Sequence, residues 1–358
     1  MFSPSEFREL VSGRRRGAAA MAMRGGLRAA ECLYAAAMRA RNWRYDSGRA
    51  EIVQVDVPVV SVGNLTLGGT GKTPLVEWLA RWYRAQGVRV TLVSRGYGAE
   101  RGARNDEALE LEQRLPDVPH VQDRDRVAAA RLAIEEFECQ LIVLDDGFQH
   151  RRLARDLDLV LIDALEPFGF EHVFPRGTLR EPLTGLRRAD VVALSRANML
   201  TADERARIES RVRRLAPRAL WCEVAHQPRR LLAAAGQEQP LAELAGRRIA
   251  AFCGIGNPAG FRHTLQSTGA QIVDFREFPD HHAYGRQDIE LLTTWANSLD
   301  VEMLVCTSKD LVKLQTDRLG RRPLLALVIE LEILAGRDKL EVRLAAPLST
   351  DDREANGL

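Results

Sequence analysis

The chain has 358 residues, 46% hydrophobic and 28% charged, which is ordinary for a globular protein of about two domains. Its net charge of +2, without a basic, aromatic-interleaved patch, gives no case for a nucleic-acid-binding protein. The five cysteines include no C-x-x-C pair, so we expect buried thiols in a reducing compartment, not disulfides or zinc ligands.

The first 45 residues are rich in alanine, methionine, leucine and arginine. Residues 17–44 are compatible with a helix, but no apolar run approaches the ~20 residues that span a bilayer. The apolar stretch 18–23 is too short for the core of a signal peptide. Two interpretations stay open: an amphipathic helix packed on the body, or an interfacial helix lying on anionic lipid.

Apolar runs then alternate with helical patterns, which predicts an α/β fold with a doubly wound, mostly parallel sheet. The expected strands of this part are 57–62, 88–94, 140–144, 157–163 and 190–195. Its expected helices include 74–86, 124–138 and 201–215. In such a sheet, ligands bind beyond the carboxyl ends of the strands.

A polar stretch near 226–246 indicates a boundary before a second, smaller α/β domain. The elements expected there are strands at 247–253, 271–275 and 301–306, helices at 258–268 and 286–298, and terminal β structure at 323–345. We therefore expect four parts: an N-terminal amphipathic helical segment (1–45), a nucleotide-binding domain (46–225), a smaller domain (226–348) and a disordered tail (349–358).

Residues 63–75, Gly-Asn-Leu-Thr-Leu-Gly-Gly-Thr-Gly-Lys-Thr-Pro-Leu, lie between an expected strand and an expected helix. Such glycines let backbone N–H groups close around an anion that the positive end of the helix faces. Lys72 is expected to reach the β- and γ-phosphates of ATP, and the Thr73 hydroxyl to bind Mg²⁺.

The pattern departs from G-x4-G-K-S/T because Thr66 stands in place of the first glycine. Lys72 is nevertheless one of four lysines in an arginine-rich chain, and a compact charge fits between phosphates better than a planar fork. The segment therefore predicts an ATP-type phosphate site, the alternative being a glycine turn with an incidental lysine.

Asp145 and Asp146 end the expected strand 140–144, where P-loop enzymes hold the Mg²⁺ shell. Paired aspartates are costly to bury unless a cation offsets their charge; the alternative is an exposed acid pair. The polar groups of Gly147-Phe148-Gln149-His150 are expected to point into the same crevice.

Other polar residues follow expected strands. Arg95 is placed to contact phosphate or to lie in a solvated turn, and Asp106-Glu107, in an expected loop, offers a general base or merely solvated acids. The rigid, charged loop 175–182 is suited to gripping an anionic substrate.

Two further segments belong to the second domain. Asp280-His281-His282 can orient a base, and it supplies too few ligands for zinc. Thr307-Ser308-Lys309-Asp310 is not the N/T-K-x-D guanine reader, so a GTPase loses its main support.

These motifs in this order resemble one family, the tetraacyldisaccharide 4'-kinases (lipid A 4'-kinases), from about residue 20 to 345. The matching segments are Val59–Leu75, Ser94–Gly98, Asp106–Glu107, Asp145–His150, Leu179–Pro182, Phe252–Phe261, Phe278–Tyr284 and Thr307–Leu314. The family transfers the γ-phosphate of ATP to the 4'-hydroxyl of a tetraacylated glucosamine disaccharide 1-phosphate, at the cytoplasmic face of the bacterial inner membrane. The resemblance implies a P-loop NTPase-like fold and no obligate protein partner.

The resemblance also implies roles for single residues. Asp106 becomes the base, oriented by His281 across the interdomain cleft, and Lys72 grips the phosphates. Mg²⁺ is held by Thr73 and Asp145. The nucleotide-binding residues are Thr66, Leu67, Gly68, Gly69, Thr70, Gly71, Lys72 and Thr73. The supporting or substrate-contacting residues are Arg95, Glu107, Asp146, Gln149, His150, Arg180, Glu181 and Asp280.

The N-terminal helices become a membrane-docking element for an acylated substrate on an anionic membrane surface. Asn105 stands where the family usually has glycine, and Ser308 where glutamate is common. Two other classes stay open: a soluble P-loop kinase or ligase acting on another phosphorylated metabolite, and a nucleotide-dependent switch or partner-binding ATPase.

Overall fold

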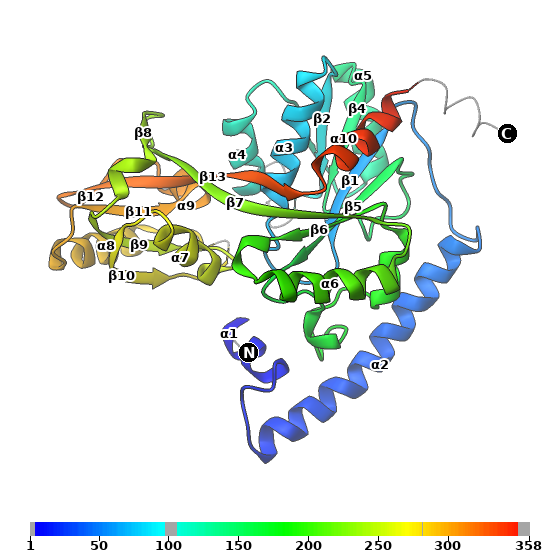
Figure 1. Cartoon of the computed structure of the whole chain (residues 1–358), viewed down its shortest axis with the longest axis horizontal. Helices are drawn as coiled ribbons and strands as arrows, with labels where there is room; N and C mark the ends of the chain where they lie inside the picture. The colour runs from blue at the N-terminus through cyan, green and yellow to red at the C-terminus, as the bar shows by residue number, and fades with distance from the viewer. Residues whose placement is uncertain (1–3, 97–105, 281, 350–358) are drawn as a thin grey trace. The chain divides into compact units, whose positions relative to one another are not determined.

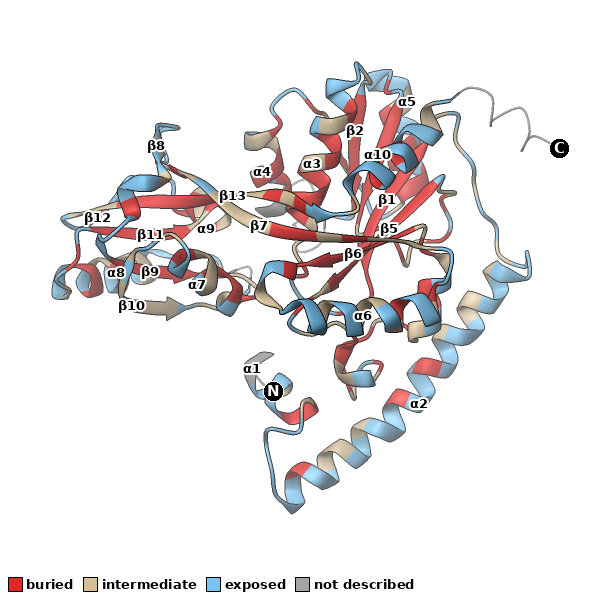
Figure 2. Ribbon diagram, in the orientation of Figure 1, coloured by how far each residue is buried: buried red, intermediate tan, exposed pale blue. Residues whose placement is uncertain are grey.

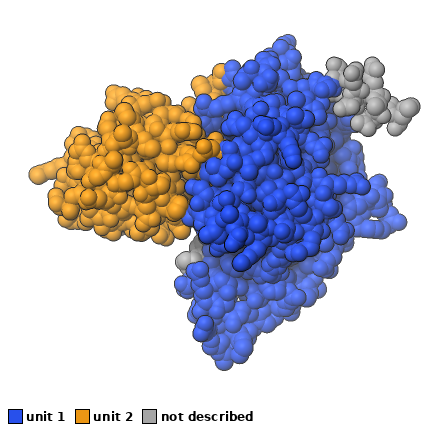
Figure 3. All heavy atoms as spheres, viewed as in Figure 1, with its two compact units in different colours: residues 1–95, 118–225, 333–358 blue, residues 96–117, 226–332 orange. Residues whose placement is uncertain are grey.

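The computed structural model describes residues 4–96, 106–280 and 282–349, with side chains from Glu6 onward except those of Asp106 and Glu107. The chain forms two compact units, coloured separately in Figure 3. Unit 1 comprises residues 1–95, 118–225 and 333–358, and unit 2 comprises residues 96–117 and 226–332. Each unit has its own apolar core, and strands of both belong to one thirteen-stranded sheet of the described residues.

Unit 1 is built on a sheet with the strand order β7-β6-β5-β1-β4-β2-β3, in which every pair is parallel (Figure 1). Its strands are β1 (Val59–Asn64), β2 (Val90–Ser94), β3 (His120–Gln122), β4 (Leu141–Asp145), β5 (Leu157–Asp163), β6 (Val191–Ser195) and β7 (Leu220–Leu232), the last of which continues into unit 2. Each of the five predicted strands is present, shifted by no more than two residues. The predicted α/β fold with a mostly parallel sheet is confirmed.

Every residue of β1, β2, β4 and β6 is buried, as expected of strands covered on both faces (Figure 2). The helices of unit 1 are α1 (Pro4–Val11), α2 (Ala18–Asp46), α3 (Lys72–Ala85), α5 (Arg126–Phe137), α6 (Ala202–Leu215) and α10 (Arg337–Ala345). Its short 3₁₀ turns are η1 (Gly169–Glu171), η2 (Leu183–Arg188), η3 (Ala197–Met199) and η5 (Ala346–Leu348). The helices predicted near 17–44, 74–86, 124–138 and 201–215 are thus confirmed.

Unit 2 has the strand order β10-β9-β11-β13-β7. Its strands are β8 (Glu238–Pro240), β9 (Arg248–Cys253), β10 (Gln271–Glu277), β11 (Met303–Thr307), β12 (Arg318–Leu319) and β13 (Arg322–Ala335), the last of which continues into unit 1. Its helices are α4 (Asp106–Arg114), α7 (Pro258–Gln266), α8 (Arg286–Ser298), α9 (Ser308–Leu314) and the 3₁₀ turn η4 (Leu241–Leu244).

Two parts of the sequence fold differently from expectation. The segment 323–345 was expected to be β structure throughout, but Gly336 has a φ of 84° and helix α10 follows it. Leu340 and Leu344, four residues apart, are the buried residues of α10 and carry the helical spacing that the apolar run before them obscured. The polar stretch 226–246, expected as a boundary, contains the end of β7 and strand β8. Most residues of β7 are only partly buried, so this strand lacks the continuous apolar run that the prediction relied on.

Helix α4 belongs to unit 2, although the chain places it between β2 and β3 of unit 1. Arg114 at its end donates a hydrogen bond to Ser308 Oγ at 3.0 Å and another to the Ile329 carbonyl at 3.1 Å. The same guanidinium pairs with Glu110 at 3.0 Å. These contacts fasten the helix that begins at Asp106 to α9 and β13 of its own unit.

Helix α2 is exposed along most of its length, as Figure 2 shows, and its buried residues are Ala20, Glu31 and Ala35. Large apolar side chains on it face solvent: Met21 is 64% exposed and Leu33 77%. No helix within the described residues is long and apolar enough to cross a membrane.

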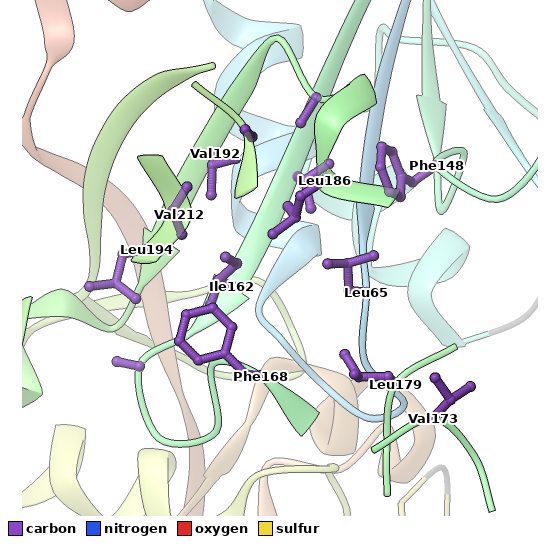
Figure 4. Packing of buried hydrophobic residues seen from close by; sticks show 14 of the residues in the cluster. Leu65, Phe148, Ile162, Phe168, Val173, Leu179, Leu186, Val192, Leu194 and Val212 are labelled. Carbon is purple, nitrogen blue, oxygen red and sulfur yellow. The ribbon is translucent and has the colours of Figure 1, made fainter. Parts of the chain in front are cut away.

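Two glycines bring β1 and the segment after β4 into contact. A β-carbon at Gly63 would lie 2.5 Å from the β-carbon of Phe148 and 2.8 Å from its backbone nitrogen. One at Gly147 would lie 2.6 Å from Ser61 Oγ. Phe148 is fully buried, in the cluster that Figure 4 shows with Leu65 and others. The strand that leads into the glycine loop therefore packs directly on the segment that carries the candidate acids.

Gly63→Ala is expected to lower the free energy of unfolding by about 1–3 kcal/mol, because the added methyl group overpacks this contact. Gly25→Ala is the matched control, since a β-carbon there meets nothing within 4 Å and glycine weakens a helix. The control should raise the stability by about 0.5–1 kcal/mol. Urea unfolding followed by circular dichroism measures both, and similar stabilities for the two variants would contradict this packing account.

Candidate functional site

The glycine loop joins β1 to α3 as the sequence predicts. Gly68 and Gly71 have φ values of 104° and 84°, which side-chain-bearing residues rarely adopt. Among the described residues, no side chain caps the N-terminus of α3, which begins at Lys72. Its first N–H groups and its positive dipole end are therefore directed at the loop, as anion binding requires.

The Lys72 ammonium lies between the carboxylate of Asp146 and the side-chain amide oxygen of Asn64. Its ammonium is 3.3 Å from Asp146 Oδ1 and donates a hydrogen bond of 3.3 Å to Asn64 Oδ1. Arg180 binds the same carboxylate, with Nη1 at 2.8 Å from Oδ1 and 2.7 Å from Oδ2 of Asp146. One carboxylate thus fixes two cations next to the glycine loop.

Two features of this position are energetically unfavourable for Asp146. Its φ of 52° is uncommon for a residue other than glycine, and its burial opposes ionisation. The charges of Lys72 and Arg180 outweigh that burial and hold the pKa of the Asp146 carboxyl well below its usual range. Asp146 is therefore a carboxylate at every pH at which the protein is expected to work.

Arg180 and Glu181 reach the site because the loop 175–182 pairs with the glycine loop through backbone hydrogen bonds. The Arg180 N–H donates to the Leu65 carbonyl at 2.7 Å, and the Leu67 N–H donates to the Thr178 carbonyl at 2.7 Å. The charged loop therefore lies directly beside the glycine loop, where its predicted role in anion binding requires it to be.

Gln149 and Glu181 form a polar network that connects the charged loop to Asn64 at the end of β1. Gln149 Nε2 donates to the Asn64 carbonyl at 2.9 Å and to Glu181 Oε1 at 3.1 Å. Glu181 is fully buried, and it accepts hydrogen bonds from Arg188 at 2.9 Å and from Asn42 of helix α2 at 2.8 Å. Since these groups satisfy one another, Glu181 supports the site without facing a ligand itself.

Thr73 and Asp145, the candidate Mg²⁺ ligands, are both buried near the loop. Thr73 is the second residue of α3, and Asp145 ends β4 in register with Val62 of β1. Within the described part of the chain, no group of three or more His, Cys, Asp or Glu side chains could hold a metal. This donor set fits Mg²⁺, which commonly takes one or two protein ligands together with phosphate oxygens and water.

Arg126, at the start of α5, is a site residue that the sequence analysis missed. It is 4% exposed, and its Nε has no hydrogen-bond partner among the described residues. Burial and the charge of Arg95 lower the pKa of the Arg126 guanidinium, while Asp145 and Asp146 act in the opposite direction. The signal that could have identified it is an arginine in the first turn of a helix that follows β3, at the carboxyl edge of the sheet.

The other predicted residues lie as follows. Arg95 is exposed just after β2. Asp106 and Glu107 begin helix α4 and do not lie in a loop as expected. Asp280 is exposed after β10, and His281 lies outside the described residues.

His150 ends the segment after β4, and its imidazole is half-buried. Burial and the charges of Arg126, Arg155 and Arg41 lower its pKa to about 4. Its Nε2 has no hydrogen-bond partner among the described residues. The imidazole is therefore neutral near pH 7.

The depressed pKa of His150 predicts a pH dependence of stability. Between pH ~6.5 and about 4 the unfolded chain binds a proton at this residue and the folded chain does not, so stability falls as the pH falls. His150→Gln is expected to remove a part of this loss on the order of 2 kcal/mol. Urea unfolding from pH 7 to pH 4 measures it, and identical pH profiles for wild type and variant would contradict the assigned environment.

A parallel sheet whose glycine loop enters a helix at Lys72, beside acids that end the neighbouring strand, defines a P-loop nucleotide-binding phosphotransferase. The family model for tetraacyldisaccharide-1-P 4'-kinase matches residues 23–349. The chain belongs to this family.

Individual relatives agree with the family match. The tetraacyldisaccharide 4'-kinase of Anaeromyxobacter sp. (strain K) is 40% identical over 344 residues, covering 89% of each chain. That of Geobacter sulfurreducens is 38% identical, covering 92% of this chain and 95% of its own. A solved structure of LpxK from Aquifex aeolicus in complex with ATP has a TM-score of 0.72 and 29% identity, covering 91% of this chain and 100% of that one.

Proposed function

We propose that the protein transfers the γ-phosphate of ATP to the 4'-hydroxyl of a tetraacylated glucosamine disaccharide 1-phosphate, in the synthesis of lipid A. The observation that carries the proposal is the placement of Lys72, which Asn64 and Asp146 hold at the start of α3, in a chain of this family. A compact cation fixed at the end of a glycine loop is what phosphoryl transfer requires of its phosphate site.

The residues of unit 1 divide the binding of ATP and Mg²⁺ between them. Residues 66–73 bind the phosphates through backbone N–H groups, the Lys72 ammonium and the Thr73 hydroxyl. Thr73 and Asp145 hold Mg²⁺, which neutralises charge on the β- and γ-phosphates when it is bound. Asp146 keeps Lys72 and Arg180 in place, and Gln149 and Glu181 support them, because these contacts hold the two loops together.

The residues of unit 2 handle the acceptor in this proposal. Asp106 takes the proton of the 4'-hydroxyl as the phosphoryl group transfers, and His281 orients Asp106. Glu107 and Asp280 adjoin these two groups in sequence and support them.

The acylated acceptor implies a membrane surface. Helix α2 exposes Met21, Leu33 and Trp43, and arginines punctuate its length. We infer that α2 lies on anionic lipid at the cytoplasmic face of the inner membrane, with its arginines at the headgroups. The buried Glu31 and the hydrogen bond from Asn42 to Glu181 tie this helix to unit 1 near the phosphate site.

Lys72→Ala is expected to weaken ATP affinity by about 10- to 100-fold, the effect of losing a hydrogen-bonded cation at a phosphate. Calorimetric titration with ATP and Mg²⁺ measures it. Lys339→Ala, on the exposed face of α10, is the matched control and should leave the affinity unchanged. An equal affinity for Lys72→Ala and wild type would refute the phosphate role.

Asp106→Ala is expected to lower the rate of phosphate transfer by about 10²- to 10⁴-fold, because general-base help is lost. ATP affinity should stay within about twofold, since the base acts on the acceptor. The assay follows label from γ-labelled ATP into the disaccharide in mixed micelles, with Asp117→Ala as a control acid in the same segment. Wild-type turnover in Asp106→Ala would exclude it as the base.

A further inference from the structure

Helix α1 precedes the residues that the family model matches, which begin at residue 23, yet it packs closely on other parts of unit 1. Its last residues, Leu10 and Val11, are 0% and 2% exposed. Arg24 of α2 donates to the Leu10 carbonyl at 3.4 Å, and Arg176 of the charged loop donates to the Val11 carbonyl at 2.8 Å. These guanidinium groups satisfy the carbonyls at the end of α1 and fix the helix in position.

Aromatic contacts join α1 to Phe174, the residue just before the charged loop. The ring of Phe7 lies 6.3 Å from that of Phe174, and the Tyr34 ring of α2 lies 6.1 Å from Phe174. The Tyr34 hydroxyl donates to the carbonyl of Arg180 at 3.1 Å. Helix α1 is thereby connected to the loop whose Arg180 holds Asp146.

Arg8 extends from this fixed helix to the glycine loop. A β-carbon at residue 68 would lie 3.0 Å from Arg8 Nη2, so Gly68 leaves room for the guanidinium as well as adopting its φ of 104°. The Arg8 side chain is exposed, and within the described residues it makes no hydrogen bond or ion pair. A planar group with five donors is thus held beside a phosphate loop with its donors available.

Glu166 is the acid that Arg8 influences. Burial raises the pKa of the Glu166 carboxyl, while a short hydrogen bond from Thr178 and the charge of Arg8 oppose that rise. Thr178 in turn accepts the hydrogen bond from Leu67 that joins the two loops. Arg8 could therefore serve only to offset the charge of Glu166, which is a structural role. That role predicts no effect of Arg8 on ligand binding, whereas a role in binding phosphate does.

We propose that Arg8 binds phosphate oxygens of the ligand at the glycine loop, as a cation that α1 adds to Lys72 and Arg180. Arginine suits this role because its fork matches two phosphate oxygens at once. The phosphate belongs either to ATP or to the 1-phosphate of the acceptor, and only the second source rests on the proposed function. Arg8 would also link the N-terminal segment on the membrane surface to the reaction site.

The test compares Arg8→Gln, Arg8→Lys and the control Arg16→Gln, which removes the same charge from the exposed segment between α1 and α2. Calorimetry with a non-hydrolysable ATP analogue and Mg²⁺ measures nucleotide affinity without an acceptor. The KM for the disaccharide 1-phosphate in mixed micelles measures the acceptor. Thermal unfolding confirms that each variant is folded.

If ATP supplies the phosphate, Arg8→Gln should weaken the analogue about 5- to 10-fold, with Arg8→Lys intermediate and Arg16→Gln unchanged. If the acceptor supplies it, analogue affinity should hold and KM for the disaccharide should rise by a similar factor. Both constants within twofold of wild type, or an equal effect of Arg16→Gln, would overturn the proposal. Weaker analogue binding in a protein that phosphorylates no disaccharide would support Arg8 and refute the proposed substrate.

Discussion

The ion pairs of Asp146 with Lys72 and Arg180 are the interaction on which the phosphate site depends. They join three segments that are distant in sequence: the glycine loop, the end of β4 and the loop 175–182. Burying a carboxylate is costly, and the two cations offset that cost while the carboxylate fixes them in place. Because the protein itself positions Lys72, less conformational freedom is lost when a phosphate binds.

The packing around this interaction explains why glycines recur in the motifs. Gly63 and Gly147 let β1 and the segment after β4 touch, which brings Asp146 within reach of Lys72. A side chain at either position would push β1 away from the segment that carries Asp146. The geometry of the site therefore depends on these glycines, which permit close backbone contact, as much as on the charged residues.

Much of unit 1 could be predicted because its signals are local. Buried strands such as β1 and β4 are short apolar runs, and the glycines before Lys72 mark the turn into α3. The rest depends on contacts between distant segments. Nothing local to residues 106–114 shows that α4 packs in unit 2, and the burial of Arg126 appears only once β3 and α5 are placed. Helix α10 was missed because the apolar run of β13 continues to Ala335, just before it.

The N-terminal segment also could not be placed from local sequence alone. Its composition left a packed helix and a membrane-surface helix as alternatives, and α2 combines features of both. Exposed Met21 and Leu33 leave apolar surface for lipid, while Glu31 and Asn42 bind unit 1. Helices α1 and α2 contact both the glycine loop and the loop 175–182. We infer that the membrane-docking segment and the phosphate site are connected through these contacts.

The most direct test of the central claim is the destination of the γ-phosphate. Wild-type protein is incubated with γ-labelled ATP, Mg²⁺ and the tetraacylated disaccharide 1-phosphate in mixed micelles, and label is counted in the lipid and as free phosphate. Our account predicts label in the lipid, at the 4' position, with little free phosphate. Label released only as free phosphate, at the same rate without the disaccharide, would contradict it.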